Sequence, residues 1–269
     1  MIDLAGKKAI VTGGGSGIGS GICQILAKAG ADVMVVDLDK HLAEKVAGNL
    51  RGQGIFHFGE VDVTDQDSVV SVVNYSLSLF ENIDILVNNA GVIGVGSWWE
   101  REKPNDEDWA RVHDVNVRGM VRMSNEVSPH MVKRNYGKII NIASISGRQG
   151  SPDLPHYSSS KAAAISWTQS NALQLASFGI NVNAVCPGLL WTPMWEAIAR
   201  KRALFGGPAD GVEGLTGREV FDTTIEQWIP MKREQTPEDI GNVVSFLVSD
   251  LAKNITGQSI NVDGGRFTS

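Results

Sequence analysis

A tyrosine and a lysine stand four residues apart in the stretch "HYSSSKA", as Tyr157 and Lys161. In a helix this spacing places both side chains on one face. A phenol has an ordinary pKa near ~10 and is a poor base at neutral pH, but a nearby ammonium favours its charged form. The pair therefore predicts an acid/base centre in which Tyr157 moves the proton and Lys161 lowers the pKa of the phenol. Taken alone, it also fits an exposed tyrosine beside a solvated lysine.

A glycine-rich turn near the N-terminus provides a second chemical signal. The letters "TGGGSGIG" at residues 12–19 lead from an apolar run into a helical pattern. Glycines let a backbone approach a phosphate, and a helix start offers unpaired N–H groups and the positive end of its dipole. The spacing is Thr-Gly-x-x-x-Gly-x-Gly, from Thr12, Gly13, Gly17 and Gly19, and differs from the common Gly-x-Gly-x-x-Gly of dinucleotide sites.

Seven short β-branched runs alternate with longer amphipathic stretches along the chain. The runs cover residues 8–13, 32–37, 54–62, 83–91, 137–144, 179–188 and 258–265. Their apolar character on both faces and their spacing predict a parallel sheet with helices on either side. Thr64 and Thr236 are expected to begin two of the helices as N-caps, the second with Pro237 in its first turn.

One segment, residues 189–235, breaks this alternation. Several glycines interrupt its weak helical patterns. A long irregular insertion after the carboxyl end of a strand is more often a lid or a binding loop than a stably packed element. The segment is expected to be a substrate lid, and the alternative is a mobile surface excursion.

Length and charge exclude several classes of protein. A chain of 269 residues fits a single domain, 1–269, with one insertion. The net charge of −6 and the lack of a basic run argue against nucleic acid as a partner. No apolar run approaches the ~20 residues that span a bilayer. Because the first predicted strand begins within a few residues of Met1, no signal segment is expected, and the protein should be cytoplasmic.

Cysteine and histidine usage points away from disulfides and metals. Cys23 and Cys186 are expected to be buried thiols, since two cysteines in a chain of this length do not form a disulfide framework. The five histidines show no ligand spacing, and no metal site is expected.

Together these motifs resemble the short-chain dehydrogenase/reductase family, in its single-domain branch, over essentially the whole chain. The resemblance is carried by the glycine turn, "VVD" ending at Asp37, "VDV" at 61–63, "NNAG" at 88–91, Asn116, Ser144, Tyr157, Lys161, "PG" at 187–188 with Thr192, and the C-terminal "VDGG". It implies an α/β fold of the Rossmann type, a doubly wound seven-stranded parallel sheet that binds a dinucleotide at the carboxyl ends of its strands. Members of this size are usually tetramers that pair through the long helices around Asn116 and Tyr157 and through the C-terminal strand, so a homotetramer is expected.

The residue at the end of the second predicted strand bears on the choice of cofactor. The carboxylate of Asp37 can accept hydrogen bonds from the adenosine ribose hydroxyls and would repel a 2′-phosphate. Neither the glycine turn nor Leu38 supplies a guanidinium to offset that repulsion. NAD is therefore expected rather than NADP, although Asp37 could also cap the next helix. By resemblance, the cofactor is contacted by Gly13, Ser16, Gly17, Ile18, Gly19, Asp37, Asp62, Val63, Asn89, Ala90, Gly91, Tyr157, Lys161, Pro187, Gly188, Leu190 and Thr192.

The resemblance also assigns catalytic roles. Tyr157 is the acid/base, Lys161 tunes it and binds the nicotinamide ribose, Ser144 orients the substrate oxygen, and Asn116 holds a water that relays protons. Without the family pattern, Asn116 would be interpreted as a solvated helix residue. An enoyl reductase of the family would carry a wider spacing between tyrosine and lysine.

The substrate is expected to be a small-molecule alcohol or ketone. The segments "GSPDLPHYSSSKAA" and "PGLLWTPMW" look most like acetoin reductase/butanediol dehydrogenase and polyol dehydrogenases, which favours a polyol, a sugar or a vicinal diol. Ile145 departs from that group, where a polar residue often follows the serine, and favours a bulkier apolar alcohol as an alternative. The substrate contacts are expected from Ser144, Ser146, Ser151, Trp98, Trp191 and Trp195, although the tryptophans could instead fill the interior of the lid. A third alternative is a non-catalytic NAD-binding regulator on the same fold.

Overall fold

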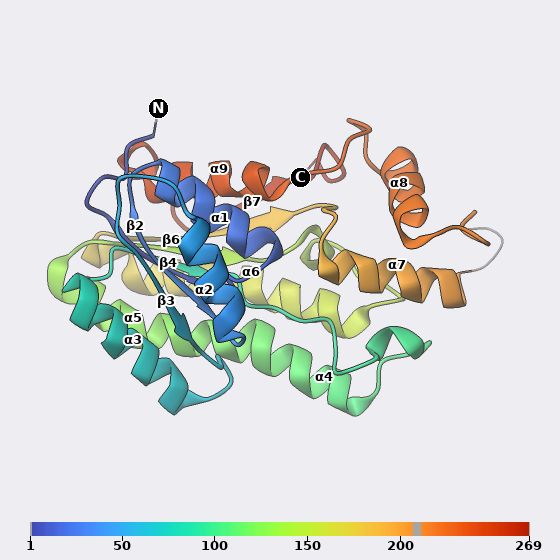
Figure 1. Cartoon of the computed structure of the whole chain (residues 1–269), viewed down its shortest axis with the longest axis horizontal. Coiled ribbons are helices and arrows are strands. Elements are labelled where there is room, and N and C mark those ends of the chain that lie inside the picture. Colours follow the sequence, from blue (N-terminus) through green and yellow to red (C-terminus); the bar gives the residue numbers. More distant parts are fainter. Residues whose placement is uncertain (1, 207–210, 269) are drawn as a thin grey trace.

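The computed structural model describes residues 2–206 and 211–268 and has a parallel sheet of seven strands at its centre (Figure 1). The strands are β1 (Lys8–Thr12), β2 (Asp32–Asp37), β3 (Phe56–Glu60), β4 (Ile85–Asn88), β5 (Gly137–Ile142), β6 (Ile180–Pro187) and β7 (Ser259–Val262). Their order in the sheet is β3-β2-β1-β4-β5-β6-β7. Each corresponds to one of the seven predicted runs, and the Rossmann-type fold is confirmed.

Side chains leave each strand alternately toward two apolar layers. On β2, Val33 and Val35 pack on one side, whereas Met34 and Val36 pack on the other. The first layer contains Ile22 and other side chains of the helices α1 (Gly17–Lys28) and α9 (Pro237–Val248). Because both faces of the sheet are covered, its strands carry almost continuous apolar sequence.

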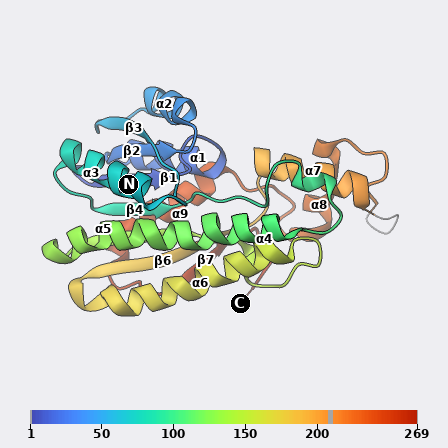
Figure 2. The ribbon, with the colours of Figure 1, turned by 90° about the horizontal axis from the view of Figure 1, so that it is seen from below.

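The second face is covered by long helices that lie side by side (Figure 2). The helices between α1 and the predicted lid are α2 (Lys40–Asn49), which packs in the first layer, and α3 (Gln66–Phe80), α4 (Asp106–His113), α5 (Met120–Arg134) and α6 (Pro155–Leu175), with short 3₁₀ turns between some of them. A π-helical turn, Asp114–Gly119, joins α4 directly to α5. Among the described residues, no helix combines the length and the apolar character required to cross a membrane.

One of the two predicted helix caps is confirmed and the other is wrong. Thr236 accepts a hydrogen bond from the N–H of Asp239, whose carboxylate bonds back to Thr236, so α9 begins with a capping box. At α3 the cap is Asp65, one residue beyond the expected Thr64. The hydroxyl of Thr64 instead donates to the carboxylate of Asp62, at 2.7 Å.

The lid segment, 189–235, is more regular than expected. It forms two helices, α7 (Pro193–Phe205) and α8 (Gly217–Trp228), which project beyond the sheet in Figure 1. They are stabilised by an apolar cluster of Ile145, Leu189, Trp195, Phe221, Ile225 and Ile229. The expectation of an irregular loop is therefore corrected, because these side chains form a small core between the segment and Ile145. Residues 207–210 of the predicted lid lie outside the described residues.

Candidate active site

A cavity of about 1040 Å³ runs along the carboxyl ends of the strands and under α7 and α8. Most of the predicted site residues line it. They are Gly13, Ser16, Gly17, Ile18, Asp37, Asp62, Val63, Asn89, Ala90, Gly91, Ser144, Ser146, Ser151, Tyr157, Lys161, Pro187, Gly188, Leu190, Thr192 and Trp195. A single hollow thus reaches from the glycine turn to the tyrosine, as a dinucleotide site in a doubly wound sheet requires.

The glycine turn is packed too tightly for larger residues. A Cβ atom on Gly19 would lie 2.1 Å from the carbonyl oxygen of Gly13, whose own φ is +61°. The side-chain amide of Asn89 donates to the carbonyl oxygens of Thr12 and Gly13, at 3.0 and 2.9 Å. Gly19, predicted to contact the cofactor, does not line the cavity and serves this close approach of α1 to the turn. The N–H groups at the start of α1 and the backbone of Gly13, Ser16 and Gly17, which lines the cavity, fit a pyrophosphate.

The carboxylate of Asp37 lies beside the glycine turn. It accepts hydrogen bonds from the N–H of Gly15 at 2.9 Å and of Asp39 at 3.1 Å. The alternative role as a helix cap is taken by Asp39, whose side chain accepts from the first N–H groups of α2. Asp37 is thus held at the cavity wall by backbone groups on two sides, and its remaining lone pairs can meet two ribose hydroxyls.

Tyr157 and Lys161 are buried side by side near the start of α6. The ammonium of Lys161 lies 5.6 Å from the centroid of the Tyr157 ring and donates to the carbonyl oxygen of Ile142 at 2.9 Å. Burial raises the pKa of Tyr157 to about 12, although the Ser144 hydroxyl acts in the opposite direction. Burial also lowers the pKa of Lys161 to about 8.

These pKa values correct one expectation from the sequence. Burial is the largest effect on the pKa of Tyr157 and only the Ser144 hydroxyl opposes it, so Lys161 does not bring this pKa below its ordinary value. At neutral pH the phenol is protonated and can donate to a carbonyl oxygen. In the reverse direction, the phenolate would need further positive charge nearby.

Asn116 lies in the π-helical turn and does not line the cavity. Its amide oxygen accepts from the N–H of Val92 at 2.8 Å, and its amide nitrogen donates to the carbonyl of Val92 at 2.9 Å. A Cβ on Gly91 would lie 3.4 Å from this oxygen and 3.5 Å from the Lys161 ammonium. Asn116 therefore borders the lysine from behind the cavity wall and holds the backbone after β4 in place.

Of the three tryptophans expected at the substrate, only Trp195 lines the cavity. Trp98 packs with Ile93 and against Trp99, and Trp191 packs edge-on against Phe221. Both are excluded from the cavity because their rings fill these apolar clusters. The wall instead includes residues that the sequence analysis missed, Met194, Ile198, Phe205, Trp228, Phe267, Arg202 and Arg266. No local motif marks them, since they converge only when α7, α8 and the C-terminal segment fold together.

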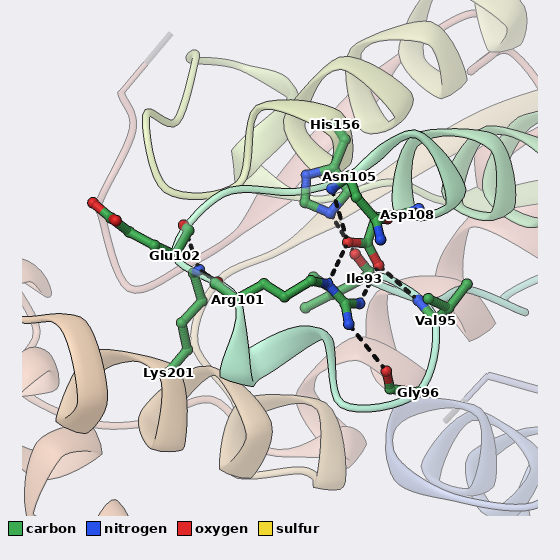
Figure 3. A network of polar contacts seen from close by, with 9 residues as sticks. All are labelled: Ile93, Val95, Gly96, Arg101, Glu102, Asn105, Asp108, His156 and Lys201. Atoms are coloured by element: carbon green, nitrogen blue, oxygen red, sulfur yellow. Dashed lines mark hydrogen bonds and ion pairs between the residues drawn. The ribbon is translucent and has the colours of Figure 1, made fainter.

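A network of polar contacts fixes the loop between β4 and α4 at the edge of the cavity (Figure 3). Arg101 binds Asp108 through two nitrogens, at 2.8 and 3.0 Å, and Asp108 is only 1% exposed. Burial alone would raise the pKa of Asp108, but the guanidinium and the N–H groups of Val95 and Asn105 outweigh it and hold this pKa below its ordinary value. From α7, Lys201 donates to the carbonyls of Arg101 and Glu102, so the loop and the lid are tied together.

His156 belongs to the same region and directly precedes Tyr157. Its Nε2 lies 2.5 Å from the carbonyl oxygen of Ile93, which can only accept, so Nε2 carries the proton (Figure 3). Its Nδ1 is buried without a hydrogen-bond partner among the described residues. Burial lowers the pKa of His156 although the bond to Ile93 opposes this. The folded protein therefore holds this imidazole neutral.

This neutral imidazole predicts a loss of stability in acid. The unfolded chain binds a proton at the ordinary pKa of about 6.5, above that of the folded state, so folding stability is complete above this pH and falls below it. His156→Gln, which keeps a donor without titrating, is expected to flatten the decrease in unfolding free energy between pH 7 and pH 5, a decrease of at most ~1.4 kcal/mol per pH unit for one group. Urea unfolding at several pH values measures it. The exposed His41→Gln serves as the control, and equal pH dependence of the two variants would contradict the assignment.

Among residues 2–206 and 211–268, no group of three or more histidine, cysteine, aspartate or glutamate side chains is arranged to hold a metal ion. Tyr157, Lys161 and Ser144 line the cavity together with the glycine turn.

Comparison with known proteins gives consistent matches over the whole chain. Residues 7–203 match the family model described as short chain dehydrogenase, and residues 207–266 match one described as enoyl-(acyl carrier protein) reductase. The chain is 36% identical over 267 residues to oxidoreductase UcpA of Escherichia coli (strain K12), covering 98% of this chain and 96% of the relative. It is 34% identical to 3-oxoacyl-(acyl-carrier-protein) reductase FabG of Thermotoga maritima, covering 97% and 98%.

Solved structures agree with these matches. NAD⁺-bound xylitol dehydrogenase aligns with a TM-score of 0.86 and 32% identity, covering 97% of this chain and 99% of that one. A variant of actinorhodin polyketide ketoreductase with NADPH aligns with a TM-score of 0.86 and 31% identity, covering 97% of each chain.

Proposed function

The chain belongs to the short-chain dehydrogenase/reductase family, and from this premise we propose that it is an NAD-dependent oxidoreductase that interconverts a secondary alcohol and a ketone. The observation that carries the proposal is the placement of Tyr157, Lys161 and Ser144 in one cavity with the glycine turn. The match of residues 207–266 to an enoyl reductase model does not extend to the chemistry, because the tyrosine and lysine are four residues apart.

Each polar group has a defined task in this proposal. A bound nicotinamide would exchange a hydride with the substrate carbon. The protonated phenol of Tyr157 donates to the carbonyl oxygen during reduction and accepts that proton during oxidation. Ser144 holds the same oxygen, and its hydroxyl, already an acceptor for the N–H of Ser146 at 3.1 Å, is oriented by that bond. Lys161 supplies positive charge beside the phenolate, which burial would otherwise disfavour.

The substrate class is proposed from the wall of the cavity. Polyols, sugars or small vicinal diols fit the resemblance and the serines Ser146 and Ser151 in the lining. The alternative of a bulkier apolar alcohol is favoured by Ile145 and the aromatic side chains of Trp195, Phe205 and Trp228. A screen of both classes with NAD⁺, recording NADH formation, tests the proposal. A complete absence of turnover would favour a cofactor-binding regulator instead.

The cofactor preference is proposed from Asp37, since the similar structures include one with NAD⁺ and one with NADPH. Asp37→Ala is expected to narrow the ratio of kcat/KM for NAD over NADP by about tenfold or more, because the repulsion of a 2′-phosphate is removed. Steady-state rates with both cofactors measure the ratio. Asp39→Ala removes a carboxylate two residues away and should leave it unchanged. Better use of NADP than of NAD by the unmodified protein would contradict the proposal.

A homotetramer and a cytoplasmic location complete the proposal. Trp109 on α4 and Leu173 on α6 are exposed apolar side chains on the long helices through which family members are expected to pair. The two cysteines, Cys23 and Cys186, are buried and unpaired with each other, which fits a reducing compartment.

A further inference from the structure

Two arginines contact the same tryptophan where α7, α8 and the C-terminal segment converge. The guanidinium carbons of Arg202 and Arg266 lie 4.9 and 5.2 Å from the centroid of the Trp228 ring. All three side chains line the cavity, and Trp228 is 40% exposed. Because both cations lie against one ring, their guanidinium carbons are at most about 10 Å apart at this wall.

Neither arginine forms an ion pair within the part of the chain that the structure describes. Arg202 donates to the Thr224 hydroxyl at 2.5 Å, which leaves most of its five N–H donors uncommitted. The protein as a whole is acidic, with a net charge of −6. Two cations in one cavity with no carboxylate partner among the described residues are therefore not a consequence of its overall composition.

Arg218 also stacks on aromatic rings, but its contacts are those of a structural residue. Its guanidinium lies 5.2 Å from the rings of Trp191 and Phe221, and it pairs with Asp222 at 2.9 Å and Glu234 at 3.2 Å. It does not line the cavity. Arg218 is thus paired with carboxylates and lies outside the cavity, whereas Arg202 and Arg266, in the cavity wall, pair with no carboxylate of the described residues.

The backbone on either side of Arg266 is held in a defined position. The buried carboxylate of Asp263 accepts from the N–H of Gly265 at 3.0 Å and of Phe267 at 2.9 Å, so the segment after β7 closes into a tight turn. Arg202 is in the last turn of α7, a regular helix. Both cations are therefore carried by ordered backbone.

Most other charged groups of the wall are engaged elsewhere. Lys201 is bound to the carbonyls of Arg101 and Glu102. Burial lowers the pKa of Lys201, and the carboxylates of Asp153 and Glu102 offset only part of this effect. Asp37 borders the glycine turn, at the end of the cavity assigned to the cofactor. Arg111, also in the wall, donates to the Thr64 hydroxyl at 3.4 Å and lowers the pKa of Asp62. Apart from Lys103, the cations of the wall whose side chains have no carbonyl or carboxylate partner among the described residues are thus Arg202 and Arg266.

We propose that Arg202 and Arg266 bind an anionic group of the substrate, a carboxylate or a phosphate, at the wall formed with Trp228. This inference rests on the proposed function and narrows its substrate class to alcohols and ketones that carry such a group. Guanidinium groups bind both oxyanions through paired hydrogen bonds. The apolar side chains of Ile198, Phe205 and Phe267 line the same cavity and would contact the carbon chain of the substrate.

The test measures binding separately from turnover. The Tyr157→Phe protein, saturated with NADH, is titrated by calorimetry with sorbitol, gluconate and a sorbitol phosphate, and with β-hydroxyoctanoate and its methyl ester. We expect at least one anionic probe to bind about tenfold or more tightly than its neutral counterpart. The preferred probe identifies the anion as carboxylate or phosphate. Added salt should weaken this binding.

Arginine variants then locate the contact. Arg202→Gln and Arg266→Gln, each in the Tyr157→Phe background, are expected to remove most of the preference for the anionic probe, whereas Arg218→Gln should retain it. Equal binding of every anionic probe and its neutral counterpart would overturn the inference, and so would an equal loss in Arg218→Gln. Selective anion binding by a protein that oxidises none of these alcohols would support this site and contradict the proposed function alone.

Discussion

Tyr157→Phe is expected to lower turnover by about 10²–10⁴-fold, the usual contribution of a positioned acid/base group, while NADH affinity changes little. The substitution removes one hydroxyl and keeps the ring that packs with Ile93 and Trp98. Burial raises the pKa of this phenol to about 12, so the native side chain is a proton donor at neutral pH. Stopped-flow binding of NADH and steady-state reduction of the substrate found in the alcohol screen separate the two effects.

Tyr136 offers a matched control for this substitution. Its hydroxyl is also buried, without a hydrogen-bond partner among the described residues, and the residue does not line the cavity. Tyr136→Phe should therefore leave both turnover and NADH binding unchanged. If Tyr157→Phe kept the wild-type rate on the true substrate, the acid/base role would have to pass to another group and the regulatory alternative would gain support.

Lys161→Met is expected to reduce turnover and cofactor affinity together, with a loss of kcat/KM of about 10²-fold or more. The Lys161 ammonium lies 5.6 Å from the centroid of the Tyr157 ring. Without this charge, no ammonium beside the ring offsets the free-energy cost of a buried phenolate. The remaining rate of alcohol oxidation should increase toward alkaline pH, because more of the phenol ionises as the pH approaches its raised pKa. Rates of oxidation measured across that range, with NADH affinity measured in parallel, check the prediction.

The same substitution should increase folding stability near neutral pH. The pKa of Lys161 is about 8 in the folded protein and ordinarily 10.5, so the unfolded chain binds more protons between these values. Above pH 10.5 Lys161 is neutral in both states and does not reduce the free energy of unfolding. As the pH falls toward 8, the lysine is protonated in the unfolded chain but not in the folded one, and the free energy of unfolding decreases by a total on the order of 3 kcal/mol. Lys138→Met removes another buried lysine, on β5, whose pKa burial also lowers. It should spare activity, and a parallel loss of activity in both variants would indicate damage to the fold.

The sheet could be predicted from sequence because a strand covered on both faces must be apolar throughout. Val33 to Val36, for example, supply both layers in turn, and such a run leaves little choice of structure. The lid helices were missed although two signals were present. Thr216 and Glu219 form a capping box at the start of α8, and Thr192 caps α7 with Pro193 in its first turn. The glycines of the same segment were interpreted as breaks in its helical pattern, so these two helix starts were not recognised.

Side chains at strand ends were also predictable, since parallel strands present their carboxyl ends at one edge. Aromatic side chains were not, because their direction depends on packing between distant segments. Trp191 and Trp195 are four residues apart, yet only Trp195 reaches the cavity. The pKa of Tyr157 was misjudged for a similar reason. Spacing along a helix reveals a neighbouring charge but not the loss of water around the pair.

The π-helical turn at Asp114–Gly119 has a consequence for evolutionary change in this chain. Such a turn holds one residue more than an α-helical turn, and the helix beyond it keeps its facing because the wider turn absorbs the extra residue. Deleting one residue would therefore restore a regular helix and leave Met123 and Val127, which are fully buried, against the sheet. Asn116 lies inside the turn and would shift relative to Val92, to which its amide is bound. A natural loss of one residue here should therefore spare the packing of α5 and disturb the backbone after β4.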